Sequence, residues 1–187
     1  MEYLLPCIEQ LDLAASLLDS ASPIRSRLSL ILIDNIVELM AHQKCEELIR
    51  QDSWFPKVNP PKYSAGDRGD ALGSKFANKF RFLSRIGIIS SDERDFTLFC
   101  HSIRNEAYHL GVFHDDFIFE LAWNYHKLAC GYFLRLKPSA YRVPNYGELS
   151  ENVKKYFGKE RWLFIDWETV ATSLDCLWQN ESVALRK

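Results

Sequence analysis

Hydrophobic side chains recur at three- and four-residue steps along most of the chain, which is the spacing of amphipathic α-helices. The first such stretch covers residues 2–20. The second runs from about residue 23 to 51, after a serine and a proline, Ser22 and Pro23, that suit an N-cap and a first helical position. Apolar positions wrap more than half of this second helix. A helix that is apolar on so many sides is expected in the middle of a bundle.

The middle of the chain predicts one loop and three further helices. Residues 53–70 hold three prolines and two glycines without periodicity, so we predict a long loop there. A third helix is predicted over residues 71–87, ended by a C′ glycine, Gly87. A fourth begins with a capping-box pattern, Ser90 with Glu93, and continues to Gly111. A fifth is predicted from about residue 115 to 136.

The pattern weakens after residue 137. There we predict a loop, a short helix at 147–157, a short strand at 162–165 and a helix from 166 to about 180. Short connections between the third, fourth and fifth helices imply antiparallel neighbours. The expected fold class is therefore all-α. Residues 1–136 form an antiparallel helical bundle of four to five main helices, and residues 137–187 form a small C-terminal helical extension packed on the bundle.

Composition narrows the class of protein. The chain has 187 residues, of which 47% are hydrophobic, enough to bury a core without disulfides. The net charge of −2 gives none of the basic excess that is typical of nucleic-acid binders. The five cysteines are odd in number and include no CxxC pair. This pattern is typical of reduced thiols, and it predicts a cytoplasmic protein. Neither a signal peptide nor a membrane-spanning run is predicted.

Candidate chemistry lies on the predicted fourth helix, where His101, Arg104, Asn105 and His109 interrupt an apolar pattern. In an α-helix the two histidines and the asparagine share one face, and Arg104 can reach towards His109. A histidine in the last turn feels the negative end of the helix dipole, which favours its protonated form. Arginine can hold phosphate oxygens with two hydrogen bonds, and histidine can move a proton near neutral pH. The pair therefore suits cleavage of RNA, whose 2′-OH supplies a nucleophile without a metal.

Residues 104–109 read RNEAYH and match R-N-x-x-x-H, which resembles the signature of the HEPN (higher eukaryotes and prokaryotes nucleotide-binding) superfamily. The predicted bundle over residues 1–136 also resembles theirs, whereas the extension matches no family. The resemblance implies a metal-independent endoribonuclease that acts as a symmetric homodimer with one composite site. Its products would carry a 2′,3′-cyclic phosphate and a 5′-hydroxyl. It also implies a prokaryotic toxin or anti-phage defence effector, with RNA as substrate and an antitoxin or regulatory protein as partner.

The resemblance also implies roles for single residues. Arg104 would bind the scissile phosphate, His109 would be the general acid or base, and Asn105 would position one of them. Asp34 or Glu38, on an earlier helix, would support the site, and His101 would lie at its edge. A subgroup of the family has a tyrosine two residues after the histidine, as a target of inactivating nucleotidylation. This chain has Gly111 there, so that mode of control is not expected.

Three alternatives stay open for this motif. Arg104 can instead pair with Asp34 or Glu38 and brace the bundle, in a plain interaction protein whose motif is accidental. A non-catalytic HEPN-like module would bind nucleotide or protein through the same fold. His101, His109 and His114 could also be assembled into a zinc site, but they lack the ligand spacing of one, so no metal or cofactor is expected.

Two clusters of cations are secondary candidates for RNA contact. Four cations on the predicted third helix form either a solvated face or an RNA backbone track: Lys75, Lys79, Arg81 and Arg85. A second cluster lies in the extension, with two aromatic side chains available for stacking on bases: Lys154, Lys155, Lys159 and Arg161, with Tyr156 and Trp162.

Overall fold

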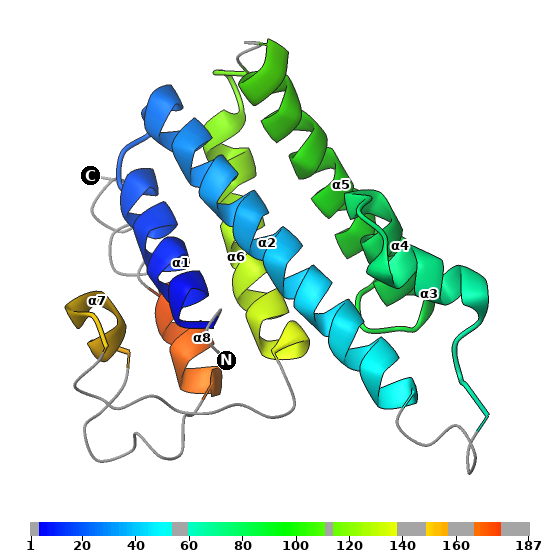
Figure 1. The fold of residues 1–187 in the computed structure, drawn as a ribbon. Coiled ribbons are helices and arrows are strands. Elements are labelled where there is room, and N and C mark those ends of the chain that lie inside the picture. The colour runs from blue at the N-terminus through cyan, green and yellow to red at the C-terminus, as the bar shows by residue number, and fades with distance from the viewer. Residues whose placement is uncertain (1–3, 54–59, 111–113, 138–148, 157–166, 177–187) are drawn as a thin grey trace.

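The fold is taken from a computed structural model, which describes residues 4–53, 60–110, 114–137, 149–156 and 167–176. Over these residues the regular secondary structure is entirely helical, as predicted (Figure 1). The elements are α1 (Leu4–Leu18), α2 (Pro23–Asp52), α3 (Ala65–Leu72), α4 (Phe76–Arg85), α5 (Ser91–Asn105), the π-helix η1 (Glu106–Leu110), α6 (Ile118–Leu136), α7 (Glu151–Lys154) and α8 (Trp167–Cys176). Among the described helices, none combines the length and apolarity that crossing a bilayer requires.

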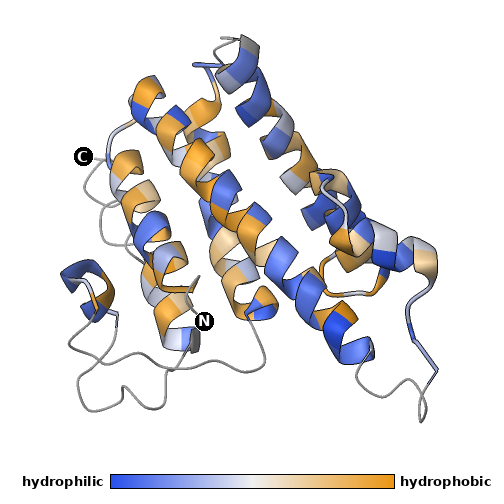
Figure 2. Ribbon diagram, in the orientation of Figure 1, coloured by the Kyte–Doolittle hydropathy of each residue, from blue (hydrophilic) through white to orange (hydrophobic). Residues whose placement is uncertain are grey.

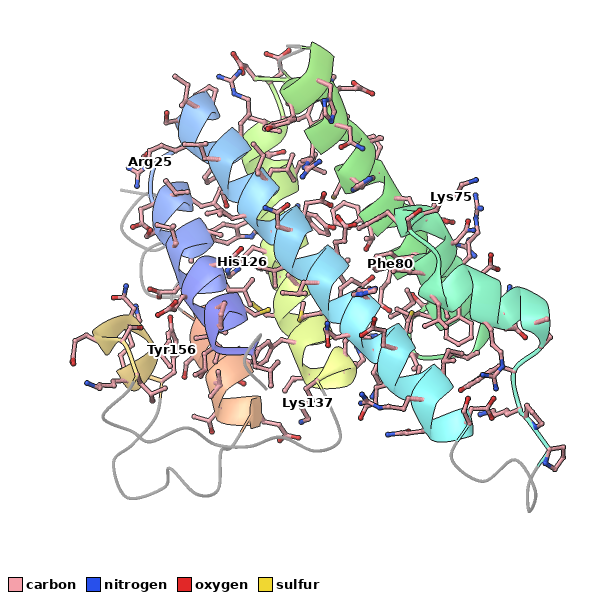
Figure 3. The ribbon with its side chains drawn as sticks, viewed as in Figure 1. Arg25, Lys75, Phe80, His126, Lys137 and Tyr156 are labelled. Carbon is pink, nitrogen blue, oxygen red and sulfur yellow. The ribbon has the colours of Figure 1, made fainter. Side chains whose placement is uncertain are left out.

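Helix α2 is the central element, as its apolar circumference predicted. It packs against α1 and α6, and its other side contacts α3, α4 and α5 (Figure 1). The first half of α2 is mainly apolar and its C-terminal half is more hydrophilic (Figure 2). Both α2 and α6 contribute fully buried side chains to the core, among them Ile33 and Val37 of α2 and Phe133 of α6. His126, labelled in Figure 3, is also buried and bonds the Leu11 carbonyl on α1 through Nε2 at 3.1 Å.

The prediction of a loop over residues 53–70 is wrong for its last part, because α3 begins at residue 65. A capping box explains this start: the Asp67 amide donates to Ser64 Oγ at 3.1 Å, and the Ser64 amide donates to the Asp67 carboxylate at 3.0 Å. The predicted helix at 71–87 is correspondingly split, with α3 ending at Leu72 and α4 starting at Phe76. Gly87 follows α4 with a φ of +78°, as a C′ glycine should.

The fourth predicted helix is confirmed at its start and corrected at its end. The Ser90–Glu93 capping box is present, with bonds of 3.1 and 2.8 Å. The last five residues, 106–110, form a π-helical turn instead of continuing the α-helix. Ser22 and Pro23 occupy the predicted positions at the start of α2, but the Ser22 side chain makes no capping hydrogen bond.

The described parts of the extension are two helices that pack on the bundle. Helix α7 is shorter than the predicted helix at 147–157, and it packs on α1, where the Tyr156 hydroxyl donates to the Asp12 carboxylate. Helix α8 lies within the predicted range of 166–180 and packs mainly on α6, and its Val170, Ala171 and Leu174 are buried. The strand predicted at 162–165 falls outside the described residues.

Candidate functional site

A fully buried carboxylate, Asp34 on α2, is the structural centre of the candidate site. Its oxygens lie 2.9 Å from His101 Nδ1, 3.1 Å from the Tyr125 hydroxyl and 3.5 Å from Arg104 Nε. The Asp34 side chain has no exposed surface. A buried charge is tolerated when it is paired and hydrogen-bonded, and here the partners come from α5 and α6. The Asp34 network therefore ties together the three helices that meet at the motif.

Asp34 also affects the pKa values of two neighbouring buried groups, the Tyr125 hydroxyl and the Cys100 thiol. Burial raises the pKa of the Tyr125 hydroxyl well above its usual value, and the neighbouring carboxylate raises it further. Burial likewise raises the pKa of the Cys100 thiol, with the same carboxylate adding to the effect. Tyr125 therefore stays protonated and donates its hydrogen bond to Asp34.

The guanidinium of Arg104 is held in one orientation. Nη1 donates to Asn105 Oδ1 at 2.9 Å, Nη2 donates to Asn35 Oδ1 at 3.1 Å, and Nε faces the Asp34 carboxylate. The Arg104 side chain is 19% exposed. The structure thus brings together Arg104, Asn105 and Asp34, and it adds Asn35 to these contacts.

The π-turn η1 changes where His109 lies relative to the rest of the motif. Five α-helical residues rotate about 140° beyond a full turn, which would place His109 well round the helix from Arg104. A π-turn has more residues per turn, so each step rotates less and His109 moves back towards the Arg104 side. Single π-turns inside helices occur frequently at functional sites.

Tyr108 connects the cation and the imidazole. The Arg104 guanidinium lies over the Tyr108 ring, 5.6 Å from its centroid. The His109 ring meets the same tyrosine edge-to-face at 5.0 Å. Tyr108 is 66% exposed and His109 is also exposed. An oriented cation and an accessible imidazole therefore contact one exposed aromatic ring at the end of α5.

The remaining histidines of the motif region have structural partners. His101 stacks on Phe76 of α4, with ring centroids 3.8 Å apart, while its Nδ1 bonds Asp34. His114 Nε2 lies 2.8 Å from the Glu106 carboxylate, so the pair links η1 to the start of α6. Over the described residues, no three side chains of the metal-ligating types are grouped in a way that could hold a metal ion.

Glu38, the other acid expected to support the site, is not in the Asp34 network. It lies instead in an open groove of about 580 Å³ between α2 and the turn that joins α3 to α4. We call this the α2–α3 groove; its walls include Asn35, Glu38, Leu39, His42, Leu72 and Ser74. Asn35 belongs both to the groove and to the Arg104 contacts.

The four cations predicted on the third helix do not share one solvent-exposed face. Lys79 is buried and donates through Nζ to the Gly73 carbonyl, so the expectation of a solvated position is wrong for this residue. Lys75 and Arg81 are exposed, and Lys75 points away from the bundle (Figure 3). Arg85 forms ion pairs with two acids of α3, Asp67 and Asp70.

The cations described in the extension are paired as well. Lys154 bonds Glu151, and Lys155 pairs with Asp12 of α1. The remaining members of that cluster, Lys159, Arg161 and Trp162, lie outside the described residues.

Three functional candidates were missed from the sequence: Tyr108, Asn35 and Tyr125. Tyr108 had a usable signal, because it lies four residues after Arg104 and therefore on the same helical face. Asn35 and Tyr125 had none, because their contacts depend on how α5 and α6 pack on α2.

Comparison of the chain with family models, with curated proteins and with solved structures found no match.

Proposed function

We propose that this protein is a metal-independent endoribonuclease of HEPN type. The observation that carries the proposal is the arrangement of the R-N-x-x-x-H residues: Arg104 is fixed from behind by Asp34, while His109 is exposed on the following turn. Tyr108 contacts both side chains. A fixed cation beside a titratable, accessible imidazole is suited to binding a phosphodiester and moving its protons.

In the proposed reaction, Arg104 binds the non-bridging oxygens of the scissile phosphate and balances the charge that develops there. One His109 imidazole takes the proton from the 2′-OH, and the 2′ oxygen forms a bond to phosphorus. The bond from phosphorus to the 5′ oxygen breaks, and that oxygen receives a proton. The products are a 2′,3′-cyclic phosphate and a 5′-hydroxyl. Asn105 and Asp34 act by orienting Arg104.

The reaction needs a base and an acid, and one chain offers a single exposed histidine in its motif. We therefore place the active site at the two-fold axis of a homodimer, where each copy contributes one Arg104 and one His109. From the family resemblance we further propose that this nuclease is a prokaryotic toxin or anti-phage effector, restrained by an antitoxin or another regulatory protein. From the cysteine pattern we propose that it acts in the cytoplasm.

Cleavage of total RNA in the presence of EDTA tests the proposal. Wild-type protein is expected to cut RNA, and Arg104→Ala and His109→Ala are expected to lose cleavage by a factor of about 100 or more. Arg50→Ala, an exposed arginine at the far end of α2, is the matched control and should cut like wild type. Absence of cleavage by wild type, or equal cleavage by the two motif variants, would remove the nuclease proposal.

The ion pair between Arg104 and Asp34 favours a second candidate, a plain helical interaction protein in which the motif is accidental and Arg104 braces the bundle. In that case Arg104→Ala and Asp34→Asn lower the free energy of unfolding, and no variant changes RNA cleavage, because there is none. Both candidates predict this loss of stability, so RNA cleavage measured on the same preparations is what separates them.

A further inference from the structure

The α2–α3 groove lies directly beside the proposed phosphate-binding arginine. Its volume of about 580 Å³ falls within the roughly 300–1,000 Å³ of pockets that hold small organic ligands. Asn35 lines the groove and at the same time accepts a hydrogen bond from Arg104 Nη2 at 3.1 Å. A nucleotide whose phosphate contacts Arg104 therefore has its own base, or that of its neighbour, within reach of the groove.

The polar groups of the groove favour a base over a phosphate. The Glu38 carboxylate has no hydrogen-bond or ion-pair partner within the described part of the chain, and it is half-buried. Of the basic side chains that line the groove, Lys79 is buried and engaged with the Gly73 carbonyl, and His42 Nε2 lies 3.2 Å from the Glu46 carboxylate. An unpaired carboxylate repels phosphate but accepts hydrogen bonds from N–H groups.

Asn35 and Glu38 offer a defined order of donors and acceptors. Asn35 Oδ1 is occupied by Arg104, so its amide NH₂ is the group left to bind a ligand. Glu38 follows three residues later, on the same face of α2, and presents two acceptor oxygens. The spacing of the two residues on α2 thus offers one donor next to two acceptors among the groups that line the groove.

From this order we infer that the α2–α3 groove is a guanine-binding site. The Watson–Crick edge of guanine presents an acceptor, O6, followed by two donors, N1–H and N2–H, which is the complementary order. Adenine and cytosine place an amino group where Asn35 needs an acceptor, and uracil places a carbonyl against the second Glu38 oxygen. Leu39 and Leu72 supply apolar contacts to the faces of the ring. The inference deepens the proposed function and rests on it for placing this guanine next to a scissile phosphate.

Calorimetric titration of the whole protein with GMP, AMP, CMP and UMP tests the site. We expect GMP to bind at least about tenfold more tightly than the other three, because a bidentate contact discriminates between bases to about that degree. Glu38→Gln should lower the affinity for GMP to that for AMP. Glu120→Gln, an exposed acid on α6, should behave like wild type.

A second variant distinguishes loss of the binding site from loss of the fold. Leu72 is 49% exposed, so Leu72→Glu should leave the fold intact while blocking GMP binding with bulk and charge. Equal affinity for the four nucleotides, or a GMP preference that survives Glu38→Gln, would overturn the inference.

The titration is independent of nuclease activity, because mononucleotides have no phosphodiester to cut. GMP binding without RNA cleavage would support the guanine-binding site and contradict the proposed nuclease activity. RNA cleavage without a preference for GMP would support the nuclease activity and contradict the guanine-binding site.

Discussion

Asp34 is the fully buried carboxylate at the centre of the candidate site. Its carboxylate has no exposed surface; it is hydrogen-bonded to His101 and Tyr125, and it lies 3.5 Å from Arg104 Nε as a counter-charge. Removing one member of such a buried set leaves the other groups without compensation, which costs more than the set contributes when intact. We therefore expect Asp34 to contribute both to the stability of the bundle and to the orientation of Arg104, and the two effects need separate measurements.

Asp34→Asn keeps the shape of the side chain and removes its charge. We expect the free energy of unfolding to fall by about 2–4 kcal/mol, since Arg104 would lose its buried counter-charge. Urea denaturation followed by circular dichroism measures the loss. Asp95→Asn, an exposed acid on the same helix as Arg104, should change the unfolding midpoint little. A loss no greater than that of the control would show that the buried network does not hold Arg104.

At the scale of elements, an ion pair joins α5 and α6, and its contribution to the free energy of unfolding depends on pH. Arg135 Nη1 and Nη2 bond the two oxygens of Glu93 at 2.9 and 2.6 Å. These bonds are the main cause that lowers the pKa of Glu93 below its usual range, aided by the Ser90 amide. A lowered folded-state pKa stabilises the protein above the unfolded pKa, about 4.3 for Glu, and this stabilisation is lost as the pH falls.

Arg135→Gln should remove that pH-dependent stabilisation. Because both side chains are partly exposed, the expected loss is only about 0.5–1 kcal/mol at pH 7. It should shrink towards zero as the pH falls below the folded-state pKa of Glu93, where the carboxyl is protonated in both states. Urea unfolding of the variant and of wild type from pH 3 to pH 7 checks this. An equal difference at every pH would mean that Arg135 stabilises α6 by packing alone.

The element boundaries also separate what the sequence can predict from what it cannot. Periodicity and capping located α1, α2, α5 and α6, because these signals are local to each helix. Helix α3 was missed because its single buried position, Ala71, gives no periodic pattern and prolines precede it. The π-turn was missed because R-N-x-x-x-H reads equally well as α-helix, and the extra width of the turn is decided by packing at the end of α5.

Within the candidate site, residue types were predictable and partners were not. Arg104, Asn105, His109 and Asp34 could be proposed from one motif and one nearby acid. That Tyr125 rather than Glu38 shares the site depends on the register between α6 and α2, which no local pattern encodes. The prediction that Lys79 lies on an exposed cationic face was wrong for a similar reason. The burial of Lys79 follows from the break between α3 and α4, where its Nζ bonds the Gly73 carbonyl.

At the scale of the whole molecule, α8 is predicted to unfold together with the bundle. Leu174 is fully buried where α8 packs on the bundle. Leu174→Ala should therefore lower the global free energy of unfolding by about 2–5 kcal/mol in a single transition. The exposed neighbour Thr172→Ala is the control. A separate early transition in urea, followed by helical circular dichroism, would instead mean that α8 is an independent unit.

The chemistry of the cut ends tests the central claim most directly. A short RNA and a copy carrying a single 2′-deoxynucleotide at the cut position are incubated with the protein in EDTA, and the products are identified by mass spectrometry. The account predicts a 2′,3′-cyclic phosphate and a 5′-hydroxyl from the RNA, no cut at the deoxy position, and no products from His109→Ala. Uncut RNA, a cut at the deoxy position, or the same products from His109→Ala would contradict it.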